Sequence, residues 1–271
     1  MEKVNVLEMF MNSRNIFYIE KDACGNIIYD DMEQLELYKE IILSDVRNEN
    51  SEIYHKKSKS WYKLTSFDLL DEDTNTVHFY DFLEDITSFK ERERELQLDN
   101  LTSLMKDRDE ANKQMSEYIT YALDKGEEFA LVVADVDYFK KINDTYGHDC
   151  GDYILQKLGP LLLRMTRQTD DPYDYRKNDI VTRFGGDEFV ILLKKVSDHD
   201  AKKRISEIKD EINNLDLIYD GYLVPIQMSF GCCHVSDNTA PYIDAEKVRK
   251  KIFKKADADL YIHKNKRGKR I

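Results

Sequence analysis

The sequence of 271 residues contains no apolar run that approaches the roughly 18 residues a membrane span needs. Its first residues mix Glu2, Lys3, Asn5 and Glu8 with apolar side chains, which is unlike the continuous apolar segment of an export signal. We therefore expect a cytoplasmic protein that does not enter a membrane.

Cysteine is scarce, and the four cysteines form neither a CxxC pair nor the spacing of a metal site. Cys232 and Cys233 are adjacent and poorly placed to bridge each other. We expect Cys24, Cys150 and this pair to be reduced thiols, as is usual in the cytoplasm.

Positive charge is in deficit, because 41 Lys and Arg residues stand against 53 Asp and Glu residues, for a formal net charge of -12 at pH 7. Proteins that hold nucleic acid do so with clustered Lys and Arg, so this balance argues against a nucleic-acid polymer as partner. A single nucleotide remains compatible with it if metal ions lie between the carboxylates and the phosphates.

The chain has enough length and apolar content, 41%, for two modest cores, so we expect two domains. Residues 16–28 predict a β-hairpin that turns at Cys24-Gly25-Asn26, with Gly25 where a positive φ is tolerated. Apolar residues at helical spacing over 35–42 predict a helix. Residues 60–70 and 76–83 predict two more strands, so the first domain is of mixed α/β type.

A highly charged helix is predicted over residues 88–98, directly after Asp85-Ile86-Thr87. Phe89 and Leu96 continue an apolar stripe from Ile86, but Glu93 interrupts it, so a two-helix contact is only weakly encoded. The order of strand, Asp-Ile-Thr and charged helix resembles the end of PAS domains, where such a helix carries signals to an output domain.

This resemblance implies a PAS-like sensor domain over residues 1–86 and a helical signalling linker over 87–98. It also implies an unknown small-molecule or protein signal. An unrelated α+β domain followed by a helical linker is the alternative.

The second half begins with an apolar run over 130–133 that ends in Asp135-Val136-Asp137, which predicts a buried strand with carboxylates at its end. Gly185-Gly186 between the apolar segments 181–184 and 188–193 predicts a hairpin. The remaining patterns predict helices over 154–163, 201–215 and 245–263 and a strand over 226–235.

Four carboxylates, those of Asp135, Asp137, Asp187 and Glu188, lie at the strand end and the hairpin turn. Two like charges about 4 Å apart repel by about 1 kcal/mol in water and about 4 kcal/mol at an effective dielectric of 20. If the two segments are neighbours, Mg²⁺ would relieve this repulsion, because it prefers a few hard oxygens. Solvated acids at loop tips are the alternative.

The segment Arg183-Phe184-Gly185-Gly186-Asp187-Glu188-Phe189 resembles the signature of GGDEF-type diguanylate cyclases. Further blocks resemble the same family, although Asp107 stands where its opening pattern more often has Asn. These blocks are residues 99–104, 135–144, Gly147-His148, Gly151-Asp152, 229–231 and 256–264. The resemblance covers residues 99–271 and implies a nucleotide-cyclase, palm-like fold of α/β (α+β) class, with a central sheet flanked by helices.

The resemblance implies metal binding by the carboxylates and one main-chain oxygen. Asp135, the Val136 carbonyl and Asp187 match the metal positions, with Glu188 as a further ligand or support. The implied cofactor is Mg²⁺, or Mn²⁺, with two ions per active site. Asp187 also matches the proposed general base for the 3′-hydroxyl, although a metal-bound carboxylate is a poor base.

Two positions match the residues that read guanine, Asn143 and Asp152. An Asp acceptor suits guanine because guanine carries N1 and N2 hydrogens that adenine lacks. Phe139 and His148 belong to the same implied nucleotide site, and Lys140 matches the position that stabilises charge on the transferring phosphate.

The resemblance implies that Lys264 or Lys269 contacts the triphosphate. Both are candidates, because the segment between them has one residue more than the usual spacing of the family. A product-inhibition site of the form Arg-x-x-Asp is also implied. Counting back from Gly185 favours Arg176 and Asp179, and counting forward from Asp152 gives the rival pair Arg167 and Asp170.

The implied reaction condenses two GTP molecules into cyclic di-GMP and two pyrophosphates. Each domain holds one GTP, so the implied assembly is a homodimer. Two alternatives remain open: a catalytically silent module that binds GTP or cyclic di-GMP and signals through a protein partner, and a relaxed base preference that yields mixed cyclic dinucleotides.

Overall fold

The computed structural model describes residues 16–21, 24, 27–29, 39, 51–55, 57–71, 76–105, 108–168, 177–236 and 244–268. The chain divides into two compact units, Met1–Glu95 and Leu96–Ile271. Five expected features lie outside the described residues: the turn residues Gly25 and Asn26, most of the helix over 35–42, and the candidate site residues Asp170, Arg176 and Lys269.

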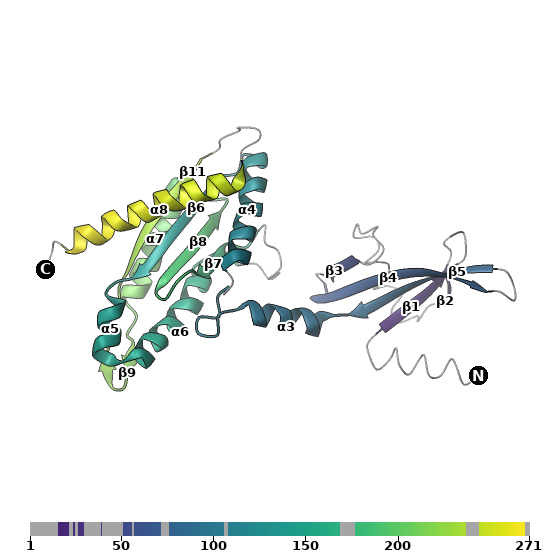
Figure 1. The fold of residues 1–271 in the computed structure, drawn as a ribbon, viewed down its shortest axis with the longest axis horizontal. Coiled ribbons are helices and arrows are strands. Elements are labelled where there is room, and N and C mark those ends of the chain that lie inside the picture. The colour runs from purple at the N-terminus through teal and green to yellow at the C-terminus, as the bar shows by residue number, and fades with distance from the viewer. Residues whose placement is uncertain are drawn as a thin grey trace. The chain divides into compact units, whose positions relative to one another are not determined.

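The first unit contains a five-stranded antiparallel sheet with the order β2-β1-β5-β4-β3 (Figure 1). Its strands are β1 (Ile16–Lys21), β2 (Ile27–Tyr29), β3 (Ser51–His55), β4 (Ser60–Asp71) and β5 (Thr76–Asp85). The predicted hairpin and the two predicted long strands are confirmed, whereas β3 was not predicted.

One face of this sheet is the buried one. Ile19 on β1, Leu64 on β4 and Leu83 on β5 are at most 4% exposed, and Leu64 lies opposite Leu83 in the register. Because side chains alternate between the faces of a strand, these residues define one apolar face.

Helix α3 (Thr87–Gln97) confirms the predicted charged helix and is anchored on the sheet at its start. Thr87 Oγ1 accepts a hydrogen bond from the main-chain nitrogen of Trp61 on β4 at 2.8 Å, and the nitrogen of Ile86 donates to the Trp61 carbonyl at 2.9 Å. Lys90 Nζ lies 2.7 Å from Glu52 Oε2 on β3 and 5.6 Å from the centre of the Trp61 ring. The first turn of α3 is thus bound to two strands of this unit.

The second unit is built on a four-stranded sheet with the order β11-β6-β8-β7 (Figure 1). These strands are β6 (Phe129–Val136), β7 (Ile180–Arg183), β8 (Glu188–Lys194) and β11 (Met228–Val235). The helices are α4 (Arg108–Lys125), α5 (Phe139–Tyr146), α6 (His148–Arg164), α7 (Asp198–Asn213) and α8 (Ala245–Gly268). A small hairpin pairs β9 (Ile218–Tyr219) with β10 (Tyr222–Leu223). Helices α4 and α5 and this hairpin were not predicted.

Every residue of β6 is buried, because helices cover both faces of the sheet. Ala130, Val132 and Ala134 pack in one core with residues of α6 and α7. Phe129 and Leu131, which alternate with them, pack in a second core with residues of α4 and α8. The continuous apolar run therefore reflects burial on two sides.

The strand pairing corrects one step of the sequence interpretation. Ligand sites at strand ends are typical of open parallel sheets, whereas β6 pairs antiparallel with both β8 and β11, and β7 pairs antiparallel with β8. The carboxylates still meet, because an antiparallel partner brings its start to the end of β6.

Among the described residues, none of the helices combines the length and the apolar character required to cross a membrane.

Candidate active site

The end of β6 and the start of β8 bring three of the four predicted acidic residues together. Asp135 lies opposite Glu188 in the register of the two strands. The main-chain nitrogen of Val136 donates a hydrogen bond to the carbonyl oxygen of Asp187 at 3.2 Å. The predicted set of Asp135, Val136, Asp187 and Glu188 is therefore one local cluster, although its members come from two segments of the chain.

Asp135 is the buried carboxylate of this cluster, with 8% of the residue exposed. Burial raises the pKa of its carboxyl group, and the negative charges of Asp187 and Glu188 act in the same direction. Lys264 opposes this shift, because its Nζ lies 2.6 Å from Asp135 Oδ1. A cation at this point stabilises the ionised form of Asp135.

The donor chemistry of the cluster fits a hard divalent cation. Among the described residues, no group of three or more Asp, Glu, His or Cys side chains is arranged to hold a metal ion by itself. Mg²⁺ does not require one, since it usually binds one or two carboxylates and keeps its other positions for water and phosphate oxygens. The ammonium group on Asp135 marks a place where a positive charge is stable.

Asp137 is bound to the neighbouring strand. Its Oδ1 accepts a hydrogen bond from Ser229 Oγ at 2.6 Å, and its main-chain nitrogen donates to the Gln227 carbonyl at 2.8 Å. These contacts fix the turn that leads from β6 to α5. The next residue, Tyr138, has a left-handed backbone with φ of 58° and is the N-cap residue that precedes α5.

Asn143 on α5 and Gly151 on α6 form a tight contact. A Cβ atom at Gly151 would lie 1.9 Å from Asn143 Oδ1 and 3.0 Å from the Phe139 ring. Asn143 Oδ1 is itself buried and has no hydrogen-bond partner within the described part of the chain. A buried polar atom without a partner is uncommon in native proteins, so this oxygen is available for a donor on a ligand.

The other predicted nucleotide residues lie on the same two helices. Lys140 on α5 and His148 and Asp152 on α6 are exposed, whereas Phe139 is half-buried against the core. Helix α6 begins directly after Gly147, whose φ of 88° allows the sharp turn between the two helices. The segment from 139 to 152 therefore presents one buried amide and several exposed polar groups.

A cavity of about 630 Å³ lies on another side of α5. It is lined by Tyr138, Lys141 and Thr145, and by residues 223–227. Lys140, Asn143 and Asp152 are not among its lining residues, so we assign it no part in nucleotide binding.

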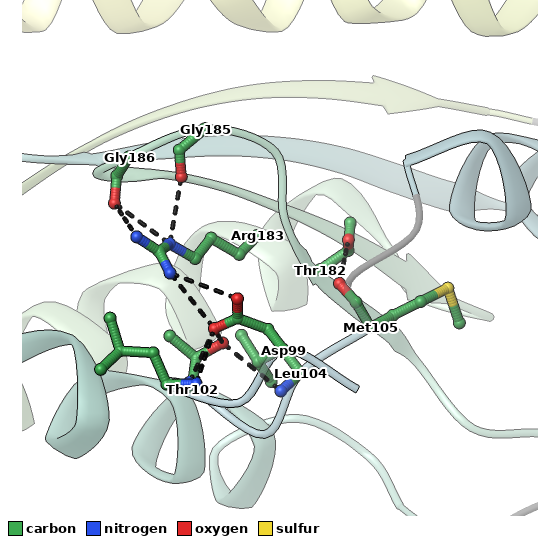
Figure 2. A network of polar contacts seen from close by, with 9 residues as sticks. Asp99, Thr102, Leu104, Met105, Thr182, Arg183, Gly185 and Gly186 are labelled. Carbon is green, nitrogen blue, oxygen red and sulfur yellow. Dashed lines mark hydrogen bonds and ion pairs between the residues drawn. The ribbon is translucent and has the colours of Figure 1, made fainter. Parts of the chain in front are cut away.

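Arg183 holds the turn between β7 and β8, as Figure 2 shows. Its Nε lies 3.1 Å from the carbonyl oxygens of both Gly185 and Gly186, and its Nη2 lies 2.8 Å from the oxygen of Gly186. Its Nη1 donates to the two carboxylate oxygens of Asp99 at 3.2 and 3.4 Å. One guanidinium group thus joins the glycine turn to a residue near the start of this unit.

Asp99 is organised to receive this cation. Its Oδ1 accepts hydrogen bonds from the main-chain nitrogen and the hydroxyl group of Thr102, both at 2.8 Å. Burial acts to raise its pKa, but these bonds and the charge of Arg183 outweigh burial, and the pKa of Asp99 falls below its usual value. Nearby, Thr182 Oγ1 donates to the Met105 carbonyl at 2.9 Å, which adds a second link between β7 and this segment (Figure 2).

The sequence interpretation missed this role. Both residues stood inside recognised blocks, but nothing in either block indicated that they form an ion pair. Residues 96–270, more than half of the chain, match the family described as "Diguanylate cyclase, GGDEF domain". The chain belongs to this GGDEF family.

Two curated relatives support the assignment of the GGDEF domain. Diguanylate cyclase A of Treponema denticola is 29% identical over 148 residues, which are 55% of this chain and 36% of that protein. Diguanylate cyclase DosC of Escherichia coli K12 is 30% identical over 155 residues, which are 56% of this chain and 30% of that protein. The chain thus spans about a third of the length of these relatives.

A solved structure shares the fold of the GGDEF domain. The coiled coil and GGDEF domain of DgcB from Caulobacter crescentus, in complex with c-di-GMP, superposes with a TM-score of 0.54 at 23% identity. The superposition covers 67% of this chain and 86% of that one.

The residues of the expected product site are only partly described. Asp179 precedes β7 of the GGDEF domain, and its carboxylate is fully buried. Oδ1 accepts a hydrogen bond from the main-chain nitrogen of Lys194 at 2.9 Å. Oδ2 accepts from the nitrogen of Arg167 at 2.7 Å and pairs with Arg204 Nη1 at 3.1 Å. The fold thus joins Asp179, from the favoured pair, to Arg167, from the rival pair.

Proposed function

We propose that this chain is a diguanylate cyclase that condenses two GTP molecules into cyclic di-GMP and two pyrophosphates. The observation that carries the proposal is the meeting of Asp135 with Asp187 and Glu188 at the end of β6. The family match and the names of the curated relatives support the same activity.

Guanine recognition is assigned to the segment formed by α5 and α6. The unpaired Oδ1 of Asn143 accepts a hydrogen bond, and the carboxylate of Asp152 accepts others, from the N1 and N2 hydrogens of guanine. Adenine presents no hydrogen at N1, so it leaves an acceptor unsatisfied. Phe139 and His148 lie on the same segment and complete the proposed nucleotide site.

The metal ligands are assigned to Asp135, the Val136 carbonyl, Asp187 and Glu188. The proposed cofactor is Mg²⁺ or Mn²⁺, two ions per active site, and the chemistry it supplies is neutralisation of charge on the triphosphate oxygens.

The chain's own residues then orient the reaction and move its proton. Asp187 takes the proton of the 3′-hydroxyl, a role that its contact with the metal weakens. The resulting oxygen forms a bond to the α-phosphorus of the other GTP while the bond to pyrophosphate breaks. Lys140 stabilises the charge on the transferring phosphate, and Lys264 or Lys269 contacts the triphosphate. Since each domain holds one GTP, the reaction requires a homodimer.

The first unit is assigned as a PAS-like sensor domain over residues 1–86, followed by a linker over 87–98 and the catalytic domain over 99–271. The antiparallel order β2-β1-β5-β4-β3, with β1 and β5 paired at the centre, supports this assignment. So does the binding of the first turn of α3 to β3 and β4. A small-molecule or protein signal at this unit would change how often two catalytic domains meet.

The activity is tested by incubating the purified protein with GTP and Mg²⁺ and identifying the product by mass spectrometry. Cyclic di-GMP is expected from GTP alone, and a mixture of GTP and ATP tests whether mixed cyclic dinucleotides form. Binding of GTP without turnover would instead identify a catalytically silent module.

Asp187→Ala is expected to abolish turnover, and Asp124→Ala, at an exposed position of α4, serves as the matched control. Retained turnover in Asp187→Ala would refute the metal assignment.

A further inference from the structure

We propose that Lys264 is the resident counter-ion of the catalytic carboxylates and competes with the divalent cation for Asp135. The cation displaces the ammonium group from Asp135, and the triphosphate accepts the displaced group. The cation and the triphosphate would therefore enter the site together. The proposal rests on the proposed function, since it concerns the same site.

The ion pair between Lys264 and Asp135 is short and lies at the edge of the buried part of the site. Lys264 Nζ lies 2.6 Å from Asp135 Oδ1, and the two side chains are 39% and 11% exposed. The lysine is therefore open to solvent and to an incoming ligand on one side. Its partner is the carboxylate that the fold has removed most completely from water within the acidic cluster.

Helix α8 holds the lysine in this position. The helix packs on β11 and β6, as Figure 1 shows by its course across the sheet. At Gly231 the helix lies so close that a Cβ atom would come within 2.0 Å of the Ala256 carbonyl. One residue before Lys264, His263 Nδ1 lies 2.9 Å from the Phe230 carbonyl oxygen. The base of the Lys264 side chain is thus fixed, while its end can change partner.

The charges at the site explain why one cation replaces the other. A divalent cation bound to Asp135 and an ammonium group on the same carboxylate repel each other. A triphosphate offers the displaced ammonium group new oxygen partners within reach of the same helix end. Binding of metal thus favours binding of triphosphate, and by linkage the triphosphate favours the metal by the same factor.

The test uses Mn²⁺ as a probe and contains no nucleotide, so it does not depend on catalysis. Binding is measured by the loss of the free-ion electron paramagnetic resonance signal. Lys264→Met removes the competing charge and is expected to bind Mn²⁺ about tenfold more tightly than the unmodified chain, the factor that corresponds to about 1.4 kcal/mol. Lys264→Arg retains the charge and is expected to bind Mn²⁺ like the unmodified chain.

Two control variants separate the possible outcomes. Lys254→Met, at an exposed position of the same helix, removes one positive charge away from the site and should leave Mn²⁺ affinity unchanged. Asp135→Asn should weaken Mn²⁺ binding in either background. Thermal unfolding of each variant shows that it is folded.

The reciprocal effect is measured with a non-hydrolysable GTP analogue. In Lys264→Met the analogue should bind more weakly, and it should increase Mn²⁺ affinity by a smaller factor than in the unmodified chain. Equal or weaker Mn²⁺ binding by Lys264→Met would overturn the counter-ion role while leaving the metal site intact. Absence of Mn²⁺ binding from every variant, with the GTP analogue present as well as absent, would overturn the metal site and the proposed function with it.

Discussion

The guanidinium group of Arg183 joins the glycine turn at Gly185 and Gly186 to the carboxylate of Asp99, 84 residues earlier in the chain. Arg183 is 18% exposed and Asp99 is 21% exposed at their side chains, so water screens this ion pair only in part. The turn precedes Asp187 directly. The ion pair therefore fixes the backbone from which a proposed catalytic carboxylate projects.

Replacing Arg183 by Lys keeps the charge but removes the planar fork that reaches three groups at once. We expect kcat to fall about tenfold, which corresponds to about 1.4 kcal/mol of lost transition-state stabilisation. The free energy of unfolding should fall by about 1–3 kcal/mol, since hydrogen bonds to charged groups are lost. Steady-state kinetics and urea unfolding measure the two effects. A stability loss with unchanged kcat would limit Arg183 to a folding role.

Gly151→Ala should impair GTP binding by moving Asn143, because the added Cβ would lie 1.9 Å from Asn143 Oδ1. The amide end of Asn143 is the mobile partner, so it will rotate away from its present position. We expect KM for GTP to rise about tenfold with kcat nearly unchanged, the signature of lost uniform binding. Asn143→Ala should give the same defect, and the double variant should be no worse. Additive defects would show that Gly151 acts by another route.

Arg204→Gln should destabilise the catalytic unit, and more strongly at pH 8 than at pH 5. Burial raises the pKa of Asp179, and the charge of Arg204 opposes that shift. Removing the charge raises the pKa of Asp179 in the folded state further. Between the unfolded pKa of about 4 and this raised pKa, the folded state binds more protons than the unfolded chain, and this pH range becomes wider. Stability then falls as pH rises through that range. Urea unfolding should show a loss of about 1–3 kcal/mol at pH 8.

The matched control for Arg204 is Arg164→Gln. Arg164 pairs with Glu211 at the surface, where both side chains are largely exposed. Its loss should cost about 0–1 kcal/mol at either pH. Equal pH dependence of the two variants would contradict the assignment to Asp179.

Arg176→Ala should relieve inhibition by cyclic di-GMP, measured as a rise in the concentration that halves the rate of GTP turnover. Asp179 is left intact in this test, because its carboxylate is buried and bonded to Lys194 and Arg167. Arg167→Ala is the comparison. Relief in Arg167→Ala alone would identify the rival pair with Asp170, and unchanged inhibition in both variants would exclude either pair.

Short-range patterns in the sequence, such as apolar runs and glycine pairs, predicted much of the local structure. The apolar run before Asp135 became β6, and Gly185-Gly186 became the turn between β7 and β8. Strand β3 and helix α4 were not predicted. The apolar residues of α4, Ala111, Met115, Ile119 and Ala122, do recur at helical spacing, and this signal could have revealed the helix.

The sequence named the residues of the candidate site, but it did not show most of their contacts. The sequence blocks named Asp135, Asp187 and Asn143, and the fold brings the first two together and leaves the oxygen of the third buried and unpaired. No pattern indicated that Asp137 binds Ser229 or that Asp179 points inward to main-chain nitrogens. The direction and partner of a polar side chain depend on residues that are distant in sequence.

The amino-acid sequence by itself determined the family, the order of most strands and helices, and the residue types available for metal and guanine, because these follow from local spacing and from recognisable blocks. Only the tertiary structure decided the antiparallel pairing of β6 with β8 and β11, the pair of Arg183 with Asp99, and the pair of Lys264 with Asp135. These contacts depend on helices and strands packing against both faces of one sheet, and that packing sets which distant charges come within a few ångströms of each other.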